Sequence, residues 1–320
     1  MRKIIIGSRS SKLALVQSEW VMGELQKTYP QYQFELIKVK TLGDKILDVP
    51  LAKIGDKGLF TKELENALLA EEIDIAVHSL KDMPTKLPEG LWLSAISERE
   101  DCRDAFVSNK YNTLSDLPQG AVVGTSSLRR IAQIKAHRPD LNIKDLRGNL
   151  QTRLGRLDDG EFDAIILASA GLKRLGQGDR IKSSIGFDVS LTAVGQGALG
   201  VETRLRDREV NAMIHKVVHH EKTAYETLAE RAFLRELEGG CQVPIGALGL
   251  LSDDGENLSL EGLVASLDGK TVYRDKMVMP KSESEKLGQT LARKLRDAGA
   301  GAILSQIFAE HRADKTTEMP

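Results

Sequence analysis

The sequence predicts an α/β protein with two α/β domains followed by a small α+β domain. Apolar segments of strand length alternate with helical periodicity over residues 3–80, and the same alternation returns over residues 105–175. After residue 219 the pattern changes to one long helix and then three strands. A chain of 320 residues is long enough for two or three such domains.

Each element follows from a local signal. The first helix has apolar residues at helical spacing and is stopped by Tyr29-Pro30. The first third is expected to contain strands 3–6, 34–39 and 74–80 and helices 11–28 and 61–71. Between them, the Gly-rich stretch 42–59 is either a lid or a solvated loop, and its composition favours neither.

The middle and last thirds are read in the same way. In the middle we expect strands 105–108, 122–124, 143–146 and 162–168, with helices 128–137, 150–158 and 171–175. The last third should hold helices 222–237 and 283–298 around strands 247–251, 258–266 and 271–279, and residues from 311 onward should be frayed. His219-His220-Glu221 is interpreted as a helix start, because adjacent helical residues point apart and make poor joint metal ligands.

Composition excludes several classes of protein. The balance of 45 Lys+Arg against 46 Asp+Glu, with 4% aromatic residues, disfavours a general nucleic-acid or anionic-membrane binder. Two cysteines, Cys102 and Cys241, make no disulfide framework, and no Cys/His set has zinc-site spacing. The apolar run at the start is too short for a signal peptide, and the stretch 164–172 is about half of a membrane span. We therefore expect a cytoplasmic protein.

Positive charge is concentrated in one stretch. Between Ser126 and Arg156 there are eight basic and two acidic residues, so this stretch carries +6 and the rest of the chain −7. Arg129 and Arg130 fall in the first turn of a helix, where cations oppose the macrodipole, and Arg147 follows a strand. Because ligands bind beyond the carboxyl ends of strands in open α/β sheets, these residues indicate an anionic ligand.

The helix that carries these arginines starts after Gly124-Thr125-Ser126-Ser127. One hydroxyl suffices to cap a helix, so three hydroxyls followed by two arginines favour anion binding over plain capping. Arginine forks suit carboxylates, but a phosphate is equally compatible with this pattern.

Two other places hold chemistry-bearing residues. Asp82 follows the strand 74–80, where a carboxylate could act as general acid/base or stabilise a cation, although a turn Asp paired with Lys81 is the slightly favoured interpretation. His78 is expected to be a packed histidine. Cys241 lies after two glycines, and the pattern leaves open whether it is a buried small residue or a reactive thiol.

Five motifs together resemble one family. They are VHSLKDMP (77–84), VGTSSLRR (123–130), LRGN (146–149), AVGQGA (193–198) and LEGGCQVP (237–244). In this combination and order the chain resembles porphobilinogen deaminases, also called hydroxymethylbilane synthases. The resemblance implies two domains similar to the lobes of type II periplasmic binding proteins, with an active-site cleft between them, and a third α+β domain. The implied boundaries are 1–98 with 196–217, then 99–195, then 218–310, with a disordered tail at 311–320.

The resemblance also implies the activity. The family condenses four porphobilinogen molecules head to tail with release of ammonia, giving a linear tetrapyrrole for heme and porphyrin biosynthesis. The chain grows on a dipyrromethane cofactor bound as a thioether to the cysteine that matches Cys241, is then released by hydrolysis, and needs no metal. A monomeric, cytoplasmic transferase is expected.

Site residues are implied by match. Asp82 matches the catalytic aspartate, which would stabilise the cation left when the amino group departs. Cofactor binding is implied for Lys81, Thr125, Ser126, Ser127, Arg129 and Arg130. Substrate binding is implied for Arg9, Ser11, Lys57, Arg147, Arg153, Arg174 and Gln196.

Two alternatives compete with this interpretation. A solute-binding module with two lobes around an anion would suit the first 218 residues, but it leaves Gly239-Gly240-Cys241 and the last domain unexplained. A nucleotide or phosphosugar enzyme would use the 125–127 helix start for phosphate, but the chain has neither a Walker pattern nor a dinucleotide glycine fingerprint.

Overall fold

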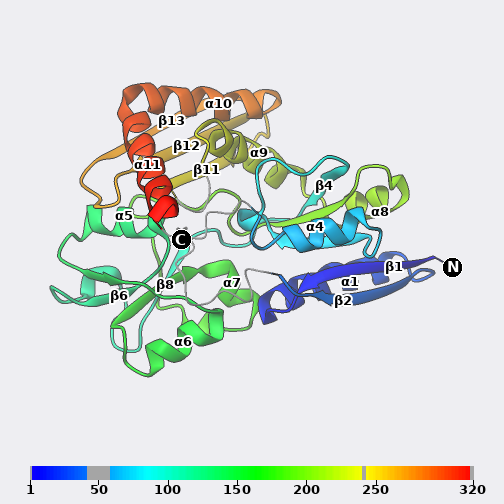
Figure 1. The fold of residues 1–320 in the computed structure, drawn as a ribbon, viewed down its shortest axis with the longest axis horizontal. Coiled ribbons are helices and arrows are strands. Elements are labelled where there is room, and N and C mark those ends of the chain that lie inside the picture. The colour runs from blue at the N-terminus through cyan, green and yellow to red at the C-terminus, as the bar shows by residue number, and fades with distance from the viewer. Residues whose placement is uncertain (1, 42–57, 240–242, 318–320) are drawn as a thin grey trace. The chain divides into compact units, whose positions relative to one another are not determined.

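The computed structural model describes residues 2–41, 58–239 and 243–317, with the side chains of 311–317 left out (Figure 1). The chain forms two compact units. Within the described residues, unit 1 comprises 2–41, 58–101 and 195–224, and unit 2 comprises 102–194, 225–239 and 243–317.

Unit 1 is built on a five-stranded sheet of order β2-β1-β3-β10-β4. Its strands are β1 (Lys3–Arg9), β2 (Gln33–Val39), β3 (Ile75–Ser79), β4 (Leu91–Ile96) and β10 (Leu199–Arg204). β1 is parallel to β2 and β3, whereas β10 is antiparallel to both β3 and β4. The carboxyl ends of β1 and β3 therefore meet at one edge of the sheet.

Helices cover both faces of this sheet because the strands alternate apolar side chains between them. Ile4 and Ile6 of β1 pack with α1 (Lys12–Thr28) and α8 (Arg208–Val218). Ile5, between them, packs toward α4 (Lys62–Leu69) on the other face. The sheet is thus buried on both sides, as a mainly parallel sheet requires.

Unit 2 contains a second five-stranded sheet, in the order β7-β6-β8-β5-β9, with the same spatial order of parallel and antiparallel strands but a different chain connectivity. Its strands are β5 (Asp104–Val107), β6 (Val122–Gly124), β7 (Asn142–Lys144), β8 (Ala164–Ala168) and β9 (Ser183–Ser184). Its helices are α5 (Leu128–His137), α6 (Leu150–Asp158) and α7 (Ser169–Arg174). As in unit 1, three parallel strands are followed by an antiparallel one, here β5. This shared order is the arrangement expected for two lobes of type II periplasmic-binding-protein form.

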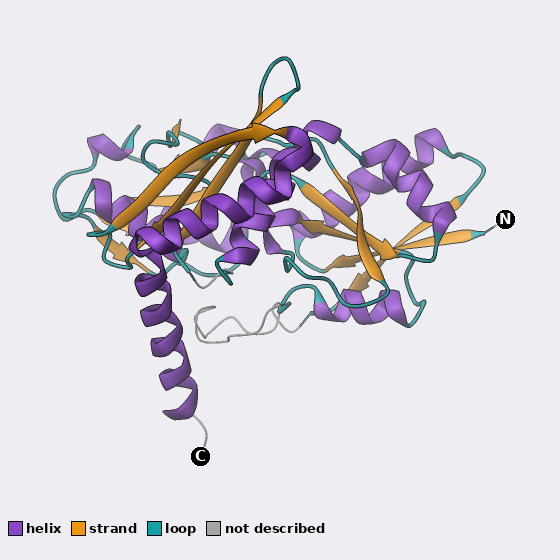
Figure 2. Ribbon diagram, turned by 90° about the horizontal axis from the view of Figure 1, so that it is seen from above, coloured by secondary structure: helices purple, strands orange, loops and turns teal. Residues whose placement is uncertain are grey.

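The rest of unit 2 is a three-stranded antiparallel sheet with helices packed along it (Figure 2). The strands are β11 (Ile245–Leu251), β12 (Asn257–Ala265) and β13 (Val272–Pro280). The helices are α9 (Glu221–Glu236), α10 (Ser284–Leu295) and α11 (Gly301–Thr317). Phe233 of α9 and Leu291 of α10 are fully buried in the core that these helices share with the sheet. The change after residue 219, from alternating strands and helices to one long helix and three strands, therefore corresponds to this separate sheet and its helices.

Some elements differ from expectation. β4 and α8 were not predicted, and α11 remains helical through Thr317 where a disordered tail from 311 was expected. α9 begins at Glu221, as expected. The three-domain boundaries stay a prediction. Within the described ranges, no helix is long and apolar enough to cross a membrane.

Candidate active site

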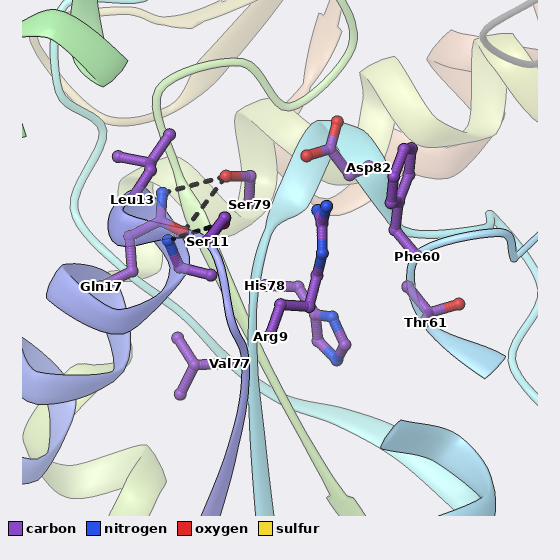
Figure 3. Close-up of a pocket in the computed structure, with 11 residues that line it drawn as sticks. Arg9, Ser11, Leu13, Gln17, Phe60, Thr61, Val77, His78, Ser79 and Asp82 are labelled. Atoms are coloured by element: carbon purple, nitrogen blue, oxygen red, sulfur yellow. Dashed lines mark hydrogen bonds between the residues drawn. The ribbon is translucent and has the colours of Figure 1, made fainter. Parts of the chain in front are cut away.

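A pocket in unit 1 lies where β1 and β3 end and α1 begins (Figure 3). Arg9 is the last residue of β1, and Asp82 ends the short 3₁₀ turn that follows β3. The pocket is lined by Arg9, Ser11, Leu13, Ala14, Gln17, Phe60, Thr61, Val77, His78, Ser79 and Asp82. Strand ends thus bring together three residues singled out from the sequence, Arg9, Ser11 and Asp82.

The Asp82 carboxylate is uncommitted. It is partly exposed in the pocket, and among the described residues no hydrogen bond or ion pair engages it. Lys81 does not pair with it; its Nζ donates to Gln196 Oε1 at 3.2 Å. The turn pair that the pattern slightly favoured is therefore not formed, and the carboxylate remains available to a ligand.

The pocket wall positions Arg9 through packing. The Arg9 guanidinium carbon lies 4.1 Å from the centre of the Phe60 ring, and Figure 3 shows the side chain extending toward Asp82 and that ring. Ser11 caps α1 by accepting a bond from the Ala14 N–H at 3.4 Å. Phe60 was missed by sequence reasoning, because it follows a stretch without periodicity and only folding brings it to Arg9.

His78 forms the floor of the pocket and is buried, as predicted. Its Nε2 lies 3.2 Å from Oε2 of Glu202, a fully buried residue of β10. Glu65 of α4 is nearby, and burial raises the pKa of its carboxyl, with the charge of Glu202 acting in the same direction. The imidazole points away from Asp82 (Figure 3), so His78 is a packed histidine whose Nε2 lies near Glu202 without a hydrogen bond among the described residues.

In unit 2, the hydroxyls before α5 have different partners. The Thr125 hydroxyl accepts from the Ser127 N–H at 3.3 Å, and the Ser126 hydroxyl donates to the Leu146 carbonyl at 2.6 Å. Ser127 is the N-cap residue of α5, yet its side chain makes no capping bond. The Ser127 hydroxyl and the first N–H groups of α5 are therefore suited to an anion.

Arg129 and Arg130, which are predicted to bind carboxylates of the cofactor, both contact a carboxylate of the protein itself. Both are buried and both bind the fully buried carboxylate of Asp104, with Nη1 of Arg129 at 2.8 Å and Nη2 of Arg130 at 2.7 Å. Burial alone would raise the pKa of Asp104, but the charges and hydrogen bonds of the two arginines outweigh it and hold that pKa far below its usual range. Sequence reasoning missed Asp104, because it lies 25 residues before Arg129 in the chain.

Three other predicted arginines lie in unit 2. Nη1 of Arg147 is buried and has no hydrogen-bond partner within the described ranges. Nε of Arg153 donates to the Gly148 carbonyl at 2.8 Å, and Arg174 ends α7. The turn between Arg147 and Arg153 requires a glycine at position 148. Its φ is +107°, and a Cβ there would lie 2.8 Å from Thr152 Cγ2.

Lys57 and Cys241 lie outside the described residues, as does most of the 42–59 stretch. No group of three or more His, Cys, Asp or Glu within the described part of the chain is arranged to hold a metal ion.

Comparison with known proteins identifies the family. A family model described as "Porphobilinogen deaminase, dipyromethane cofactor binding domain" matches residues 4–212, and "Porphobilinogen deaminase, C-terminal domain" matches residues 224–297. This chain belongs to the porphobilinogen deaminase family. The porphobilinogen deaminase of Synechococcus elongatus is 58% identical over 316 residues, covering 98% of each chain. Those of Gloeobacter violaceus and a Nostoc species are 56% and 55% identical, covering 96% and 97% of this chain and 94% and 96% of theirs.

Solved structures give a weaker likeness. A putative methionine-binding lipoprotein of Bacillus subtilis is 12% identical, with a TM-score of 0.41, covering 69% of this chain and 92% of its own. A periplasmic substrate-binding protein of Coxiella burnetii is 11% identical, with a TM-score of 0.42, covering 66% and 92%. At these TM-scores the similarity gives no information about the ligand of this member of the porphobilinogen deaminase family.

Proposed function

We propose that this chain carries out the reaction of its family as a hydroxymethylbilane synthase, with Asp82 as the catalytic carboxylate. Four porphobilinogen molecules are joined head to tail with release of ammonia, on a dipyrromethane primer held as a thioether by Cys241. The linear tetrapyrrole is then released by hydrolysis. The chain is thus a transferase of tetrapyrrole biosynthesis, and its two matched family domains support this assignment.

One observation carries the role of Asp82: a partly exposed carboxylate, with no hydrogen bond or ion pair to any described residue, stands in a pocket beside Arg9. When porphobilinogen loses its amino group, the remaining pyrrole is a cation, and a nearby carboxylate lowers the energy of that charge. The same carboxylate can hold the proton that leaves the attacked ring carbon or that accompanies the departing amine.

The residues present fit a ligand that bears carboxylates. Nη1 of Arg147 is a buried donor without a partner in the part of the chain that the structure describes, and the Ser127 hydroxyl is not used for capping. A buried donor without a partner is costly, so a ligand carboxylate at Arg147 would relieve that cost. When bound, the dipyrromethane supplies the terminal pyrrole carbon on which the chain is extended.

The remaining assignments are proposals that follow the same chemistry. Arg9, held by the Phe60 ring, is proposed to bind a substrate carboxylate beside Asp82, with Ser11 at the adjacent helix start. Lys81 and Gln196 are proposed to act as a hydrogen-bonded pair. Carboxylate binding is also proposed for Thr125, Ser126, Arg129, Arg130, Arg153 and Arg174, and a substrate contact for Lys57.

The intact mass of the purified protein tests the proposal. Wild-type protein and a Cys102→Ser control should carry the dipyrromethane mass and convert porphobilinogen to product, whereas Cys241→Ser should lack both. Active protein of unmodified mass would overturn the cofactor assignment. The solute-binding alternative predicts saturable binding of porphobilinogen without release of ammonia, so the ammonia assay separates the two functions.

We also propose that the protein is a cytoplasmic monomer, as its cysteine usage and family lead us to expect. Sedimentation velocity of the loaded protein should give a single species near 35.2 kDa.

A further inference from the structure

Asp104, Arg129 and Arg130 form a buried trio in unit 2 that the proposed reaction does not by itself explain. Oδ2 of Asp104 accepts from Arg129 Nη1 at 2.8 Å. Oδ1 accepts from Arg129 Nη2 at 3.2 Å and from Arg130 Nε and Nη2 at 3.0 and 2.7 Å. Each guanidinium therefore binds the same carboxylate through two of its nitrogens. This fixes the orientation of each guanidinium plane as well as its distance from the carboxylate.

The three side chains are also tied to the surrounding chain. The Ser190 hydroxyl donates to Asp104 Oδ2 at 2.8 Å, and Arg129 Nη1 donates to the Leu191 carbonyl at 2.7 Å. Arg130 Nη1 donates to the carbonyl of Ile166 in β8 at 3.0 Å. The Asp104 carboxylate and these hydrogen bonds thus hold Arg129 against residues 190–191 and Arg130 against β8.

The charge of the trio is unbalanced. Two guanidiniums and one carboxylate carry +1, while the three residues are only 5%, 6% and 0% exposed for Arg129, Arg130 and Asp104. Both arginines also lie in the first turn of α5, where the helix dipole disfavours a cation. A buried excess charge is costly unless a counter-charge meets it.

Hydrogen-bond donors of the trio remain available to bind an anionic group. A guanidinium has five N–H groups. Arg130 makes three bonds, to Asp104 and to Ile166, so two of its N–H groups have no bond among the described residues. The unused Ser127 hydroxyl belongs to the same helix start. The trio therefore has both the charge and the donors for one anionic group.

We propose that Asp104 is the positioning residue of Arg129 and Arg130, and that the trio receives a single carboxylate of the pyrrole ligand. This rests on the proposed function, because that function supplies a ligand rich in carboxylates. Asp104 acts by orienting the two guanidiniums and by cancelling one of their two charges.

Substitution of Asp104 distinguishes orientation from attraction by charge. Asp104→Asn leaves the shape and makes the site more positive, so attraction alone predicts that the ligand is held as well or better. Orientation predicts the reverse, because the amide nitrogen of Asn cannot accept a guanidinium bond. We expect the fraction of protein carrying the dipyrromethane mass to fall about tenfold, the effect of about one charge-assisted hydrogen bond. Asp104→Glu, which keeps the charge, should recover part of the loading.

The matched control is Asp140→Asn, since Asp140 binds Arg138 in the same unit through a solvent-accessible pair. It should load like wild type. A Asp104→Asn protein that folds, melts at a lower temperature and still loads like wild type would give Asp104 a purely structural role and overturn the proposal.

A second variant covers the case in which Asp104→Asn does not fold. Ser190→Ala removes the hydrogen bond that the hydroxyl donates to Asp104 Oδ2 and the one, at 3.2 Å, that it accepts from Arg129 Nη1, and it leaves all charges. We expect its loading to fall about twofold to fivefold at an almost unchanged melting temperature. Wild-type loading of Ser190→Ala would then overturn the proposal. Wild-type protein without any adduct mass would instead count against the proposed function, so the two failures are distinguishable.

Discussion

Asp82→Asn is the sharpest test of the pocket, because the structure separates its effect on stability from its effect on turnover. The carboxylate has no hydrogen bond or ion pair among the described residues, and it is partly exposed. Replacing it by an isosteric amide therefore breaks no hydrogen bond or ion pair to a described residue. We expect the free energy of unfolding to change by less than about 0.5 kcal/mol, as for a surface substitution.

Turnover should respond strongly to the same change. Loss of one preorganised electrostatic group, or of one general acid/base, lowers kcat about 10²–10⁴-fold. The assay is ammonia release from porphobilinogen by protein whose dipyrromethane content has been measured by mass, so that unloaded protein is not counted as inactive. Asp116→Asn, at a capping turn of unit 2, is the control and should keep wild-type kcat. A loaded Asp82→Asn protein with kcat within about threefold of wild type would refute the assignment.

Three further predictions concern other parts of the chain. Gly148→Ala should lower the free energy of unfolding by about 3 kcal/mol, because φ is +107° and the new Cβ meets Thr152; Gly120→Ala, at φ +76° with open space, should cost about 1 kcal/mol by the same denaturant titration. Burial lowers the pKa of His219 from 6.5, so its stabilising contribution is complete above that pH and is lost as pH falls; the free energy of unfolding should decline less steeply below pH 6.5 in His219→Asn than in wild type. Arg147→Met should raise the KM for porphobilinogen about tenfold without lowering the melting temperature, because Nη1 of Arg147 has no hydrogen-bond partner to lose among the described residues; a fall of several degrees would show a structural role.

Elements with strong local signals were predicted well. α5 and α6 have the predicted bounds, because helical periodicity and a terminal Arg138-Pro139 or an Asn149 cap are local properties. β4 was missed, although its pairing is extensive. β4 is held by β10, which lies about 100 residues further along the chain, and no local signal reports such a partner.

The site shows the same division. Arg9 and Asp82 could be placed near each other from the sequence, because strand ends meet at one edge of a parallel sheet. Phe60 could not, since its contact with Arg9 depends on how the chain returns after residues 42–57. The proximity of Glu202 to His78 could not be predicted either, because Glu202 lies in β10, more than 100 residues later in the chain.

The sequence by itself determined the family, through five motifs, and the positions of most helices and strands. It also located the positive charge that an anionic ligand needs. Only the tertiary structure decided which cations have a protein counter-ion: Arg129 and Arg130 bind Asp104, whereas Nη1 of Arg147 is buried without a hydrogen-bond partner among the residues described. The physical reason is that a guanidinium's availability depends on the carboxylates brought within about 3 Å of it, and those come from distant parts of the chain.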